Sequence, residues 1–275
     1  MDPRTFFAFK ELHHKHQGRG LRLVSLSETT GATYRKKGAK KLIHKSGLWA
    51  GLISGGCLEK EIVERSASEK RFSIDTRSED DRLLGYGVGC EGELILDVQE
   101  VPESWEDFCK NLLNFEESLL PRIALVGTGE DAKVMMGMMK ELRWPFQVFD
   151  SKKGPIEELQ AQGIHAHWIQ NLEPPEVELW QQQAFVLMSH SYELDLCFFD
   201  YAGRCDAQYV GVLGPKERKI KMLKDVFIIY ERHFPSRTLG YLQGPIGSMD
   251  YGRGPQAIAI GVIAELQKRL YAQFY

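Results

Sequence analysis

The chain has 275 residues, of which 43% are hydrophobic and 27% charged, a balance typical of globular proteins. Its formal net charge of -3 excludes a strongly basic overall field, so we expect no nucleic-acid partner. No apolar run approaches the roughly 20 residues of a membrane helix, and the charged N-terminal segment is unlike a secretory signal. We therefore expect a cytoplasmic protein without a membrane partner, long enough for two modest domains.

The first half, residues 1–102, has the mixed pattern of a small α/β domain rich in glycine turns. Apolar residues at helical spacing predict an amphipathic helix over residues 4–17. Short apolar or alternating runs predict strands, and one helical run lies between them. The strands are expected at residues 21–26, 41–44, 48–53, 72–75 and 93–98, and the helix at residues 58–70. Residues 103–120 then form a predicted helical connector.

The second half, residues 121–275, alternates apolar strands with helices. The strands are expected at residues 122–126, 146–149, 165–168, 185–188 and 209–213. The helices are expected at residues 131–142, 155–161, 194–202, 216–230 and 255–272. Strands that are apolar throughout, with helices between them, predict a parallel sheet covered on both faces.

A glycine-rich loop follows the first strand of the second half, with the sequence GTGEDA at residues 127–132. Gly127 permits a tight turn and Gly129 lets a ligand phosphate approach the backbone, in the strand–loop–helix context of dinucleotide-binding sites. Asp150 ends the next strand, about 20 residues on, where a ribose-binding acid is expected. These positions predict a Rossmann-like doubly wound domain and suggest NAD(P) or another nucleotide as its ligand.

Two features leave nucleotide binding open. Glu130 and Asp131 suit the helix dipole but would repel a pyrophosphate, so the loop could equally be a feature of the fold alone. His190 follows the fourth strand, at the sheet edge where doubly wound folds bind ligands, although an ordinary polar loop residue would look the same.

The five cysteines are odd in number and have no CxxC spacing, so neither a disulfide framework nor a structural zinc site is expected. Cys57 follows Ser54, Gly55 and Gly56 and precedes a charged helical run. Bare backbone gives a large ligand access, and a helix start favours a thiolate. The alternative is a small buried residue that packs the start of the helix.

A second glycine-lined loop, GVGCEG at residues 87–92, carries Cys90 directly after Gly89. We expect this loop to converge with the one around Cys57, because a single large ligand would explain both. The other three cysteines lack glycine neighbours and are interpreted as packing residues.

Several blocks, in the same order over nearly the whole chain, resemble the XdhC/CoxI family, whose members are maturation factors of molybdenum hydroxylases such as xanthine dehydrogenase. The most specific block is GLISGGCLE at residues 51–59. The other blocks are TGATYRKKGA at 30–39, LGYGVGCEG at 84–92, VGTG at 126–129, SH at 189–190, YVGVLG at 209–214, PIG at 245–247 and PQAIAI at 255–260. The resemblance implies an N-terminal XdhC-type domain followed by a C-terminal Rossmann-like domain.

The resemblance also implies a chaperone and carrier, more an accessory protein than an enzyme, and no catalytic residue is expected. The protein would bind molybdenum cofactor as cargo, support its sulfuration and deliver it to a molybdenum hydroxylase apo-enzyme. A cysteine desulfurase would be a partner, and a homodimer is expected. Cys57 and Cys90 would offer soft thiolate ligands to the metal. Arg35 would offer charge to the phosphate, and the glycine-flanked amides would give room to the pterin.

Two other classes of protein stay open. The loop at residues 127–132 and Asp150 would suit an NAD(P)-dependent oxidoreductase, although the first half shows no recognisable catalytic constellation. The other alternative is an interaction module in which the apolar C-terminal helix forms a dimer interface. The same apolar residues would suit a hydrophobic core equally well.

Overall fold

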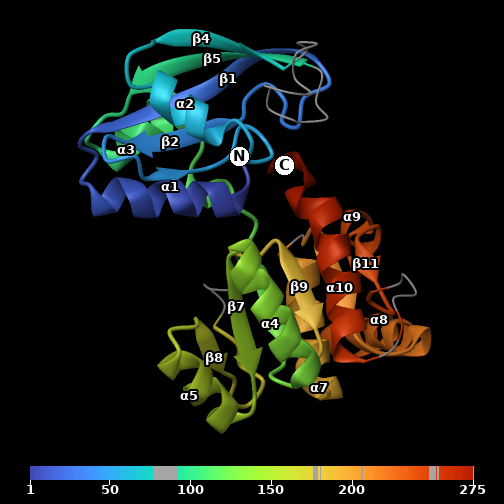
Figure 1. The fold of residues 1–275 in the computed structure, drawn as a ribbon. Coiled ribbons are helices and arrows are strands. Elements are labelled where there is room, and N and C mark those ends of the chain that lie inside the picture. The colour runs from blue at the N-terminus through green and yellow to red at the C-terminus, as the bar shows by residue number, and fades with distance from the viewer. Residues whose placement is uncertain are drawn as a thin grey trace. The chain divides into compact units, whose positions relative to one another are not determined.

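The computed structural model describes residues 1–76, 92–175, 179, 181–205, 207–247, 252 and 254–274 (Figure 1). It divides the chain into two compact units, Met1–Glu117 and Ser118–Tyr275. Each unit has its own sheet, one antiparallel and one parallel, which confirms the predicted α/β class with a parallel sheet in the second half. None of the described helices combines the length and the apolar character that crossing a bilayer requires.

An antiparallel sheet with helices packed on it forms the first unit. Its described elements are α1 (Pro3–Lys15), β1 (Leu21–Gly31), β2 (Lys40–His44), β3 (Trp49–Ala50), α2 (Glu59–Arg65), β4 (Arg71–Asp75), β5 (Gly92–Glu100), α3 (Trp105–Phe108) and the π-helix η2 (Cys109–Leu113). The strand order is β3-β2-β1-β5-β4, and a register shift between Leu26 and Glu28 marks a bulge in the central strand β1. Val24 of β1 and Ile43 of β2 are buried in a core that Ile62 of α2 completes.

The segment predicted as a connector, residues 103–120, is partly helical and packs on α1. Phe108 of α3 stacks on Phe9 of α1 with ring centroids 6.4 Å apart, and both side chains are fully buried. Burial of these rings adds the segment to the core of the first unit. The compact unit therefore extends beyond the predicted boundary at residue 102 and ends at Glu117.

A parallel sheet lies at the centre of the second unit. Its described strands are β6 (Ile123–Val126), β7 (Phe146–Asp150), β8 (Ala166–Trp168), β9 (Ala184–Leu187), β10 (Tyr209–Val212) and β11 (Leu242–Gln243). The described helices from residue 117 onward are η3 (Glu117–Leu119), α4 (Glu130–Leu142), α5 (Lys153–Ala161), α7 (Tyr192–Arg204), α8 (Lys216–Tyr230), α9 (Ser236–Leu239), α10 (Pro255–Leu266), η4 (Gln267–Tyr271) and η5 (Ala272–Phe274).

The strand order β11-β10-β9-β6-β7-β8, with parallel pairing throughout the described ladders, confirms the predicted Rossmann-like topology. The order reverses between β6 and β9, so the loops after these two strands lie at the switch point of the sheet. Sequence patterns did not predict β11, because a strand of two residues is too short to show a period.

The two faces of this sheet bury different sets of side chains. Ile123 and Leu125 pack with α4, α5 and α10, whereas Ala124 and Val126 of the same strand pack with α7 and α8. The alternation follows from the pleat of a strand, which sends successive side chains to opposite faces. Helices cover both faces, and the strand is therefore apolar throughout.

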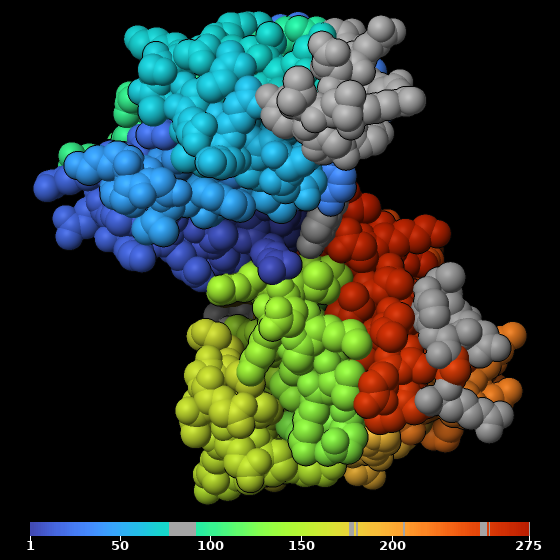
Figure 2. Space-filling model, viewed as in Figure 1, coloured from blue at the N-terminus to red at the C-terminus, as the bar shows by residue number. Residues whose placement is uncertain are grey.

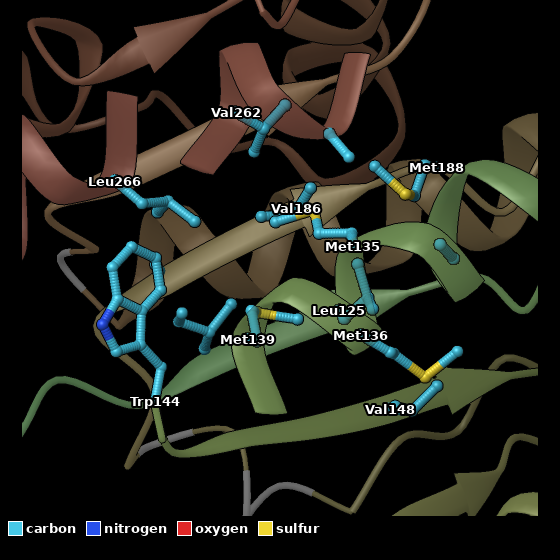
Figure 3. Packing of buried hydrophobic residues seen from close by; sticks show 14 of the residues in the cluster. Leu125, Met135, Met136, Met139, Trp144, Val148, Val186, Met188, Val262 and Leu266 are labelled. Atoms are coloured by element: carbon cyan, nitrogen blue, oxygen red, sulfur yellow. The ribbon is translucent and has the colours of Figure 1, made fainter. Parts of the chain in front are cut away.

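The face covered by α4 and α10 has a core rich in methionine (Figure 3). Met135 and Met139 of α4 pack in one cluster with Val262 and Leu266 of α10. Figure 2 shows the two helices side by side at the surface of this unit. The C-terminal helix thus contributes to the core of its own unit, while Ile260 on its outer side stays 45% exposed.

Candidate functional site

The cysteine loop, residues 51–58, joins β3 to α2. Cys57 lies in a turn two residues before α2, and it is exposed, so it is not a buried packing residue. Gly56 has a φ of 120°, which favours glycine, and a Cβ added there would meet nothing within 4 Å. The loop therefore offers accessible backbone directly before the thiol.

Glu59, the first residue of α2, holds this loop from the inside. Its Oε1 accepts hydrogen bonds from the amides of Ile53 and Ser54 at 3.1 and 2.8 Å and from the Ser54 hydroxyl at 2.9 Å. The Ser54 Oγ in turn accepts from the amides of Gly56 and Leu58, both at 3.2 Å. Ser54, which the sequence assigned to the ligand site, is buried and works inside the loop.

The second oxygen of the Glu59 carboxylate pairs with Lys41 of β2. The Nζ of Lys41 lies 2.5 Å from Oε2, and the side chains of Lys41 and Glu59 are 0% and 5% exposed. The ring of Trp49 covers the ammonium, with 3.3 Å between its centroid and the Nζ. Burial lowers the pKa of Lys41, and the hydrogen bond and charge of Glu59 oppose that shift.

Sequence reasoning missed both members of this pair. Lys41 stands at the start of a short strand and Glu59 in a charged helical run, and charged residues at such positions typically face solvent. One signal was available: a carboxylate at the first helical position, directly after a glycine loop, can accept hydrogen bonds from the amides of that loop.

The basic loop, residues 31–39, joins β1 to β2 and lies beside the cysteine loop. The ring of Tyr34 is 3.7 Å from the point that a Cβ on Gly55 would occupy. Arg35 is half-buried, its guanidinium lies 5.8 Å from the Tyr34 ring centroid, and its Nε is buried without a hydrogen-bond partner among the described residues. Lys36 and Lys37 are exposed next to it. The structure thus places the predicted phosphate-binding Arg35 on a loop that contacts the one carrying Cys57.

Cys90 and Gly89, which the sequence assigned to the same site, lie outside the described residues. The first described residue after them is Gly92, and a Cβ there would lie 2.7 Å from Cγ2 of Thr33 in the basic loop. Gly92 also exchanges hydrogen bonds with the hydroxyl of Thr76, the last described residue before them. The two residues that flank this segment therefore meet beside the basic loop, and convergence of the two thiols stays a prediction.

The remaining described cysteines differ from Cys57. Cys109 and Cys197 are buried, and burial raises the pKa of each thiol to about 11. Cys205 is partly buried, and its thiol donates to the carbonyl oxygen of Leu179 at 3.5 Å. Across the described ranges, no group of three or more His, Cys, Asp and Glu side chains is arranged to hold a metal ion.

In the second unit, the loops after β6 and β9 lie against each other at the switch point. Gly127 has a φ of 125°, and a Cβ there would lie 2.5 Å from the carbonyl oxygen of Met188. A Cβ on Gly129 would lie 3.4 Å from Nε2 of His190. His190 is exposed, and its Nε2 lies 3.8 Å from the Oδ2 of Asp131 at the start of α4. The fold thus brings Gly127, Gly129 and His190 together where doubly wound folds bind ligands.

Asp150 lies at the carboxyl end of β7, as expected, but its carboxylate points into the protein. The side chain is buried, one oxygen accepts from the Thr128 hydroxyl at 2.6 Å, and the other accepts from the Lys152 amide at 3.1 Å. A ribose hydroxyl would have to share oxygens that already have internal partners. The role of Asp150 in binding a nucleotide stays a prediction.

A pocket of about 320 Å³ lies next to His190, beyond the ends of β9 and β10. The buried Asp195 in its wall accepts from the Ser189 hydroxyl at 2.6 Å and from Nη2 of Arg218 at 2.8 Å. Burial raises the pKa of Asp195, and its hydrogen bonds to Ser189 and Arg218 oppose that shift. Sequence reasoning missed Asp195 and Arg218, because each stands in an ordinary helical pattern.

Comparison with known proteins covers both units. The family model described as "XdhC Rossmann domain" matches residues 123–266, and the one described as "XdhC and CoxI family" matches residues 14–70. The chain is similar to a probable xanthine dehydrogenase subunit of Bacillus subtilis (strain 168). The two are 22% identical over an alignment of 313 positions, which covers 89% of this chain and 91% of that protein. It is also 22% identical to "Molybdenum cofactor insertion chaperone PaoD" of Escherichia coli (strain K12), over an alignment of 296 positions that covers 96% of this chain and 88% of that protein.

A solved structure shows the same fold. The crystal structure of a xanthine dehydrogenase from Bacillus halodurans matches 99% of this chain and 97% of that one, with a TM-score of 0.73 and 19% sequence identity. The two family models confirm the resemblance to the XdhC/CoxI family that the ordered sequence blocks indicated. With the Rossmann-domain model covering more than half of its length, the chain belongs to the XdhC and CoxI family.

Proposed function

We propose that this protein is a maturation factor that binds molybdenum cofactor, stabilises it, supports its sulfuration and delivers it to a molybdenum hydroxylase. The observation that carries the proposal is the exposed Cys57, which follows an open glycine turn in the loop that the basic loop contacts. In a member of this family, an exposed thiol behind an open glycine turn suits a carrier that presents a soft ligand to its cargo.

The residues present fit the chemistry of this cargo, which combines a flat pterin, a phosphate and a metal held by a dithiolene. A thiolate is the soft ligand that proteins offer to such a metal. Arg35 carries a buried Nε without a partner in the described chain, and its guanidinium matches a phosphate in shape and charge. Gly56 leaves backbone open for a flat ring. The cargo supplies the redox chemistry to its client enzyme, and this chain holds and orients it.

The relatives support the choice of partners. One of them is named as an insertion chaperone for molybdenum cofactor, and another as a probable part of xanthine dehydrogenase. By analogy, the client of this chain is an apo-enzyme of the molybdenum hydroxylase class. We assign the sulfur-transfer chemistry to a partner cysteine desulfurase, and we expect a second copy of this chain to form a homodimer with the first.

The test is retention of the cargo. The purified protein is incubated with cofactor released from a molybdenum enzyme, passed through a gel-filtration column, and analysed for molybdenum and for pterin fluorescence. We expect the parent to retain both, and Cys57→Ala, Cys90→Ala and Arg35→Ala to retain less. Cys205→Ala and Lys60→Ala are matched controls, since Cys205 is partly buried and Lys60 is an exposed cation on α2. A parent that retains neither molybdenum nor pterin refutes the proposal.

A nucleotide at the second unit is a further candidate, favoured by the meeting of Gly127, Gly129 and His190 at the switch point. It would suit either a regulatory ligand of the carrier or an NAD(P)-dependent oxidoreductase. Titration with NAD(H) and NADP(H), followed by calorimetry and by nicotinamide fluorescence, tests both. Heat or fluorescence change that is lost in His190→Ala supports binding here, and no signal up to millimolar nucleotide removes this candidate.

A further inference from the structure

The amides of the cysteine loop fall into two groups. Four of them donate inward, either to Oε1 of Glu59 or to the Ser54 hydroxyl that Glu59 itself accepts from. Within the part of the chain that the structure describes, the amides of Gly55 and Cys57, and those of Gly51 and Leu52 at the start of the loop, have no acceptor. The loop therefore turns some of its donors into the protein and leaves others for an incoming group.

This division depends on a carboxylate that is almost fully buried. A single buried charge is strongly disfavoured, so Glu59 needs a partner of opposite charge. Lys41 supplies it from β2, a strand of the sheet, and the Trp49 ring covers the ammonium. Through the Lys41–Glu59 ion pair, the loop is fixed to a strand of the sheet as well as by hydrogen bonds within the loop itself.

The geometry points to Glu59 as a positioning residue for the cargo, a role that rests on the proposed function. Braced by Lys41, it turns four amides of the cysteine loop inward and leaves the amides of Gly55 and Cys57, with the Cys57 thiol, for molybdenum cofactor. Its own oxygens are fully occupied by protein donors, so it acts on the cargo only through the shape of the loop.

Two double variants separate hydrogen bonding from charge. Lys41→Met with Glu59→Gln removes both charges and keeps an amide oxygen as acceptor; we call it the acceptor-keeping variant. Lys41→Met with Glu59→Met removes the charges and the acceptor; we call it the acceptor-free variant. Neither leaves an unpaired buried charge, so both are expected to fold. Glu61→Gln, in the same helix and outside the loop, is the control.

The first measurement is hydrogen exchange of the loop amides, resolved by residue. The four inward amides should be protected in the parent, in the control and in the acceptor-keeping variant. They should exchange about tenfold faster in the acceptor-free variant, because the amides of Ile53 and Ser54 lose their acceptor and the Ser54 hydroxyl, to which the other two donate, loses the partner that fixes it. The second measurement is cofactor retention, which should fall in the acceptor-free variant alone.

The outcomes are distinguishable. Unchanged exchange in the acceptor-free variant overturns the inference, and so does lost protection with undiminished retention. A parent that retains no cofactor refutes the proposed function, and the positioning role with it, while the exchange data still report whether Glu59 holds the loop. If the acceptor-free variant does not fold, Ser54→Ala takes its place. The amides of Gly56 and Leu58 should then exchange faster and retention should fall, and failure of either overturns the inference.

Discussion

Gly127 and Met188 approach so closely that a Cβ on Gly127 would lie 2.5 Å from the carbonyl oxygen of Met188. The two residues are about 60 positions apart in the chain but follow neighbouring strands, β6 and β9. This close approach holds the glycine loop, residues 127–132, against the loop after β9 that carries His190. Absence of a side chain at residue 127 is therefore a requirement of the fold, whether or not a nucleotide binds.

Gly127→Ala should destabilise the protein by about 2–3 kcal/mol, because alanine is strained at a φ of 125° and its Cβ would collide with backbone. The free energy of unfolding, measured in urea, reports the loss. Gly137→Ala is the matched control: its Cβ would meet nothing within 4 Å inside α4. It should stabilise by about 0.5–1 kcal/mol through helix propensity. Equal effects of the two substitutions would contradict the steric argument.

Thr128→Val should destabilise the protein by about 1–3 kcal/mol, since it keeps the shape of the side chain and removes the donor to the buried Asp150 carboxylate. Urea unfolding measures the change. Thr30→Val, at an exposed position near the end of β1, should change stability by less than about 0.5 kcal/mol. A negligible effect of Thr128→Val would show that the carboxylate finds another donor, such as water.

Alkylation should distinguish the thiols. At pH 7.5, iodoacetamide should modify Cys57 more than about tenfold faster than Cys109 or Cys197, because Cys57 is exposed and the other two are buried as neutral thiols. Peptide-resolved mass spectrometry follows each site separately. In concentrated urea the three rates should become similar, which is the control for intrinsic reactivity. A protected Cys57 in the folded protein would remove the basis of the carrier proposal.

Stability should fall as the pH rises from about 9 to about 11. The folded state holds the pKa of Cys109 and of Cys197 at about 11, above the ordinary thiol value of 9.0, so it keeps protons that the unfolded chain has lost in that window. Because the unfolded state then binds fewer protons, its free energy drops relative to the folded state. Below pH 9 the contribution of both thiols is fully present.

The check on this pH dependence is urea unfolding at pH 7.5, 9.5 and 10.5. The double variant Cys109→Ala with Cys197→Ala should lose less stability over this range than the parent. The free energy of unfolding of the variant at pH 7.5 is its own reference, because the smaller side chains also lose packing contacts. Parallel declines of parent and variant would mean that other groups control the alkaline transition.

Local sequence patterns were sufficient for the main elements. The apolar runs at β6 and β9 and the helical spacing of α4 and α10 predicted a parallel sheet covered on both faces, because burial on two sides demands apolar residues at every strand position. Patterns failed where an element was short, as for β11, because a strand of two residues shows no period. The aromatic residues of α3, which stand in the predicted connector, are buried against α1 and belong to the first compact unit.

For the site, the sequence by itself determined the residue types that the chemistry needs: a cysteine behind two glycines, and a basic loop. Only the tertiary structure decided which donors remain available. The bond between Lys41 and Glu59 joins residues 18 positions apart, and it forms because β2 lies beneath the cysteine loop. No periodic pattern records such a contact, since the free energy of a buried charge depends on its surroundings in space and not on its neighbours in the chain.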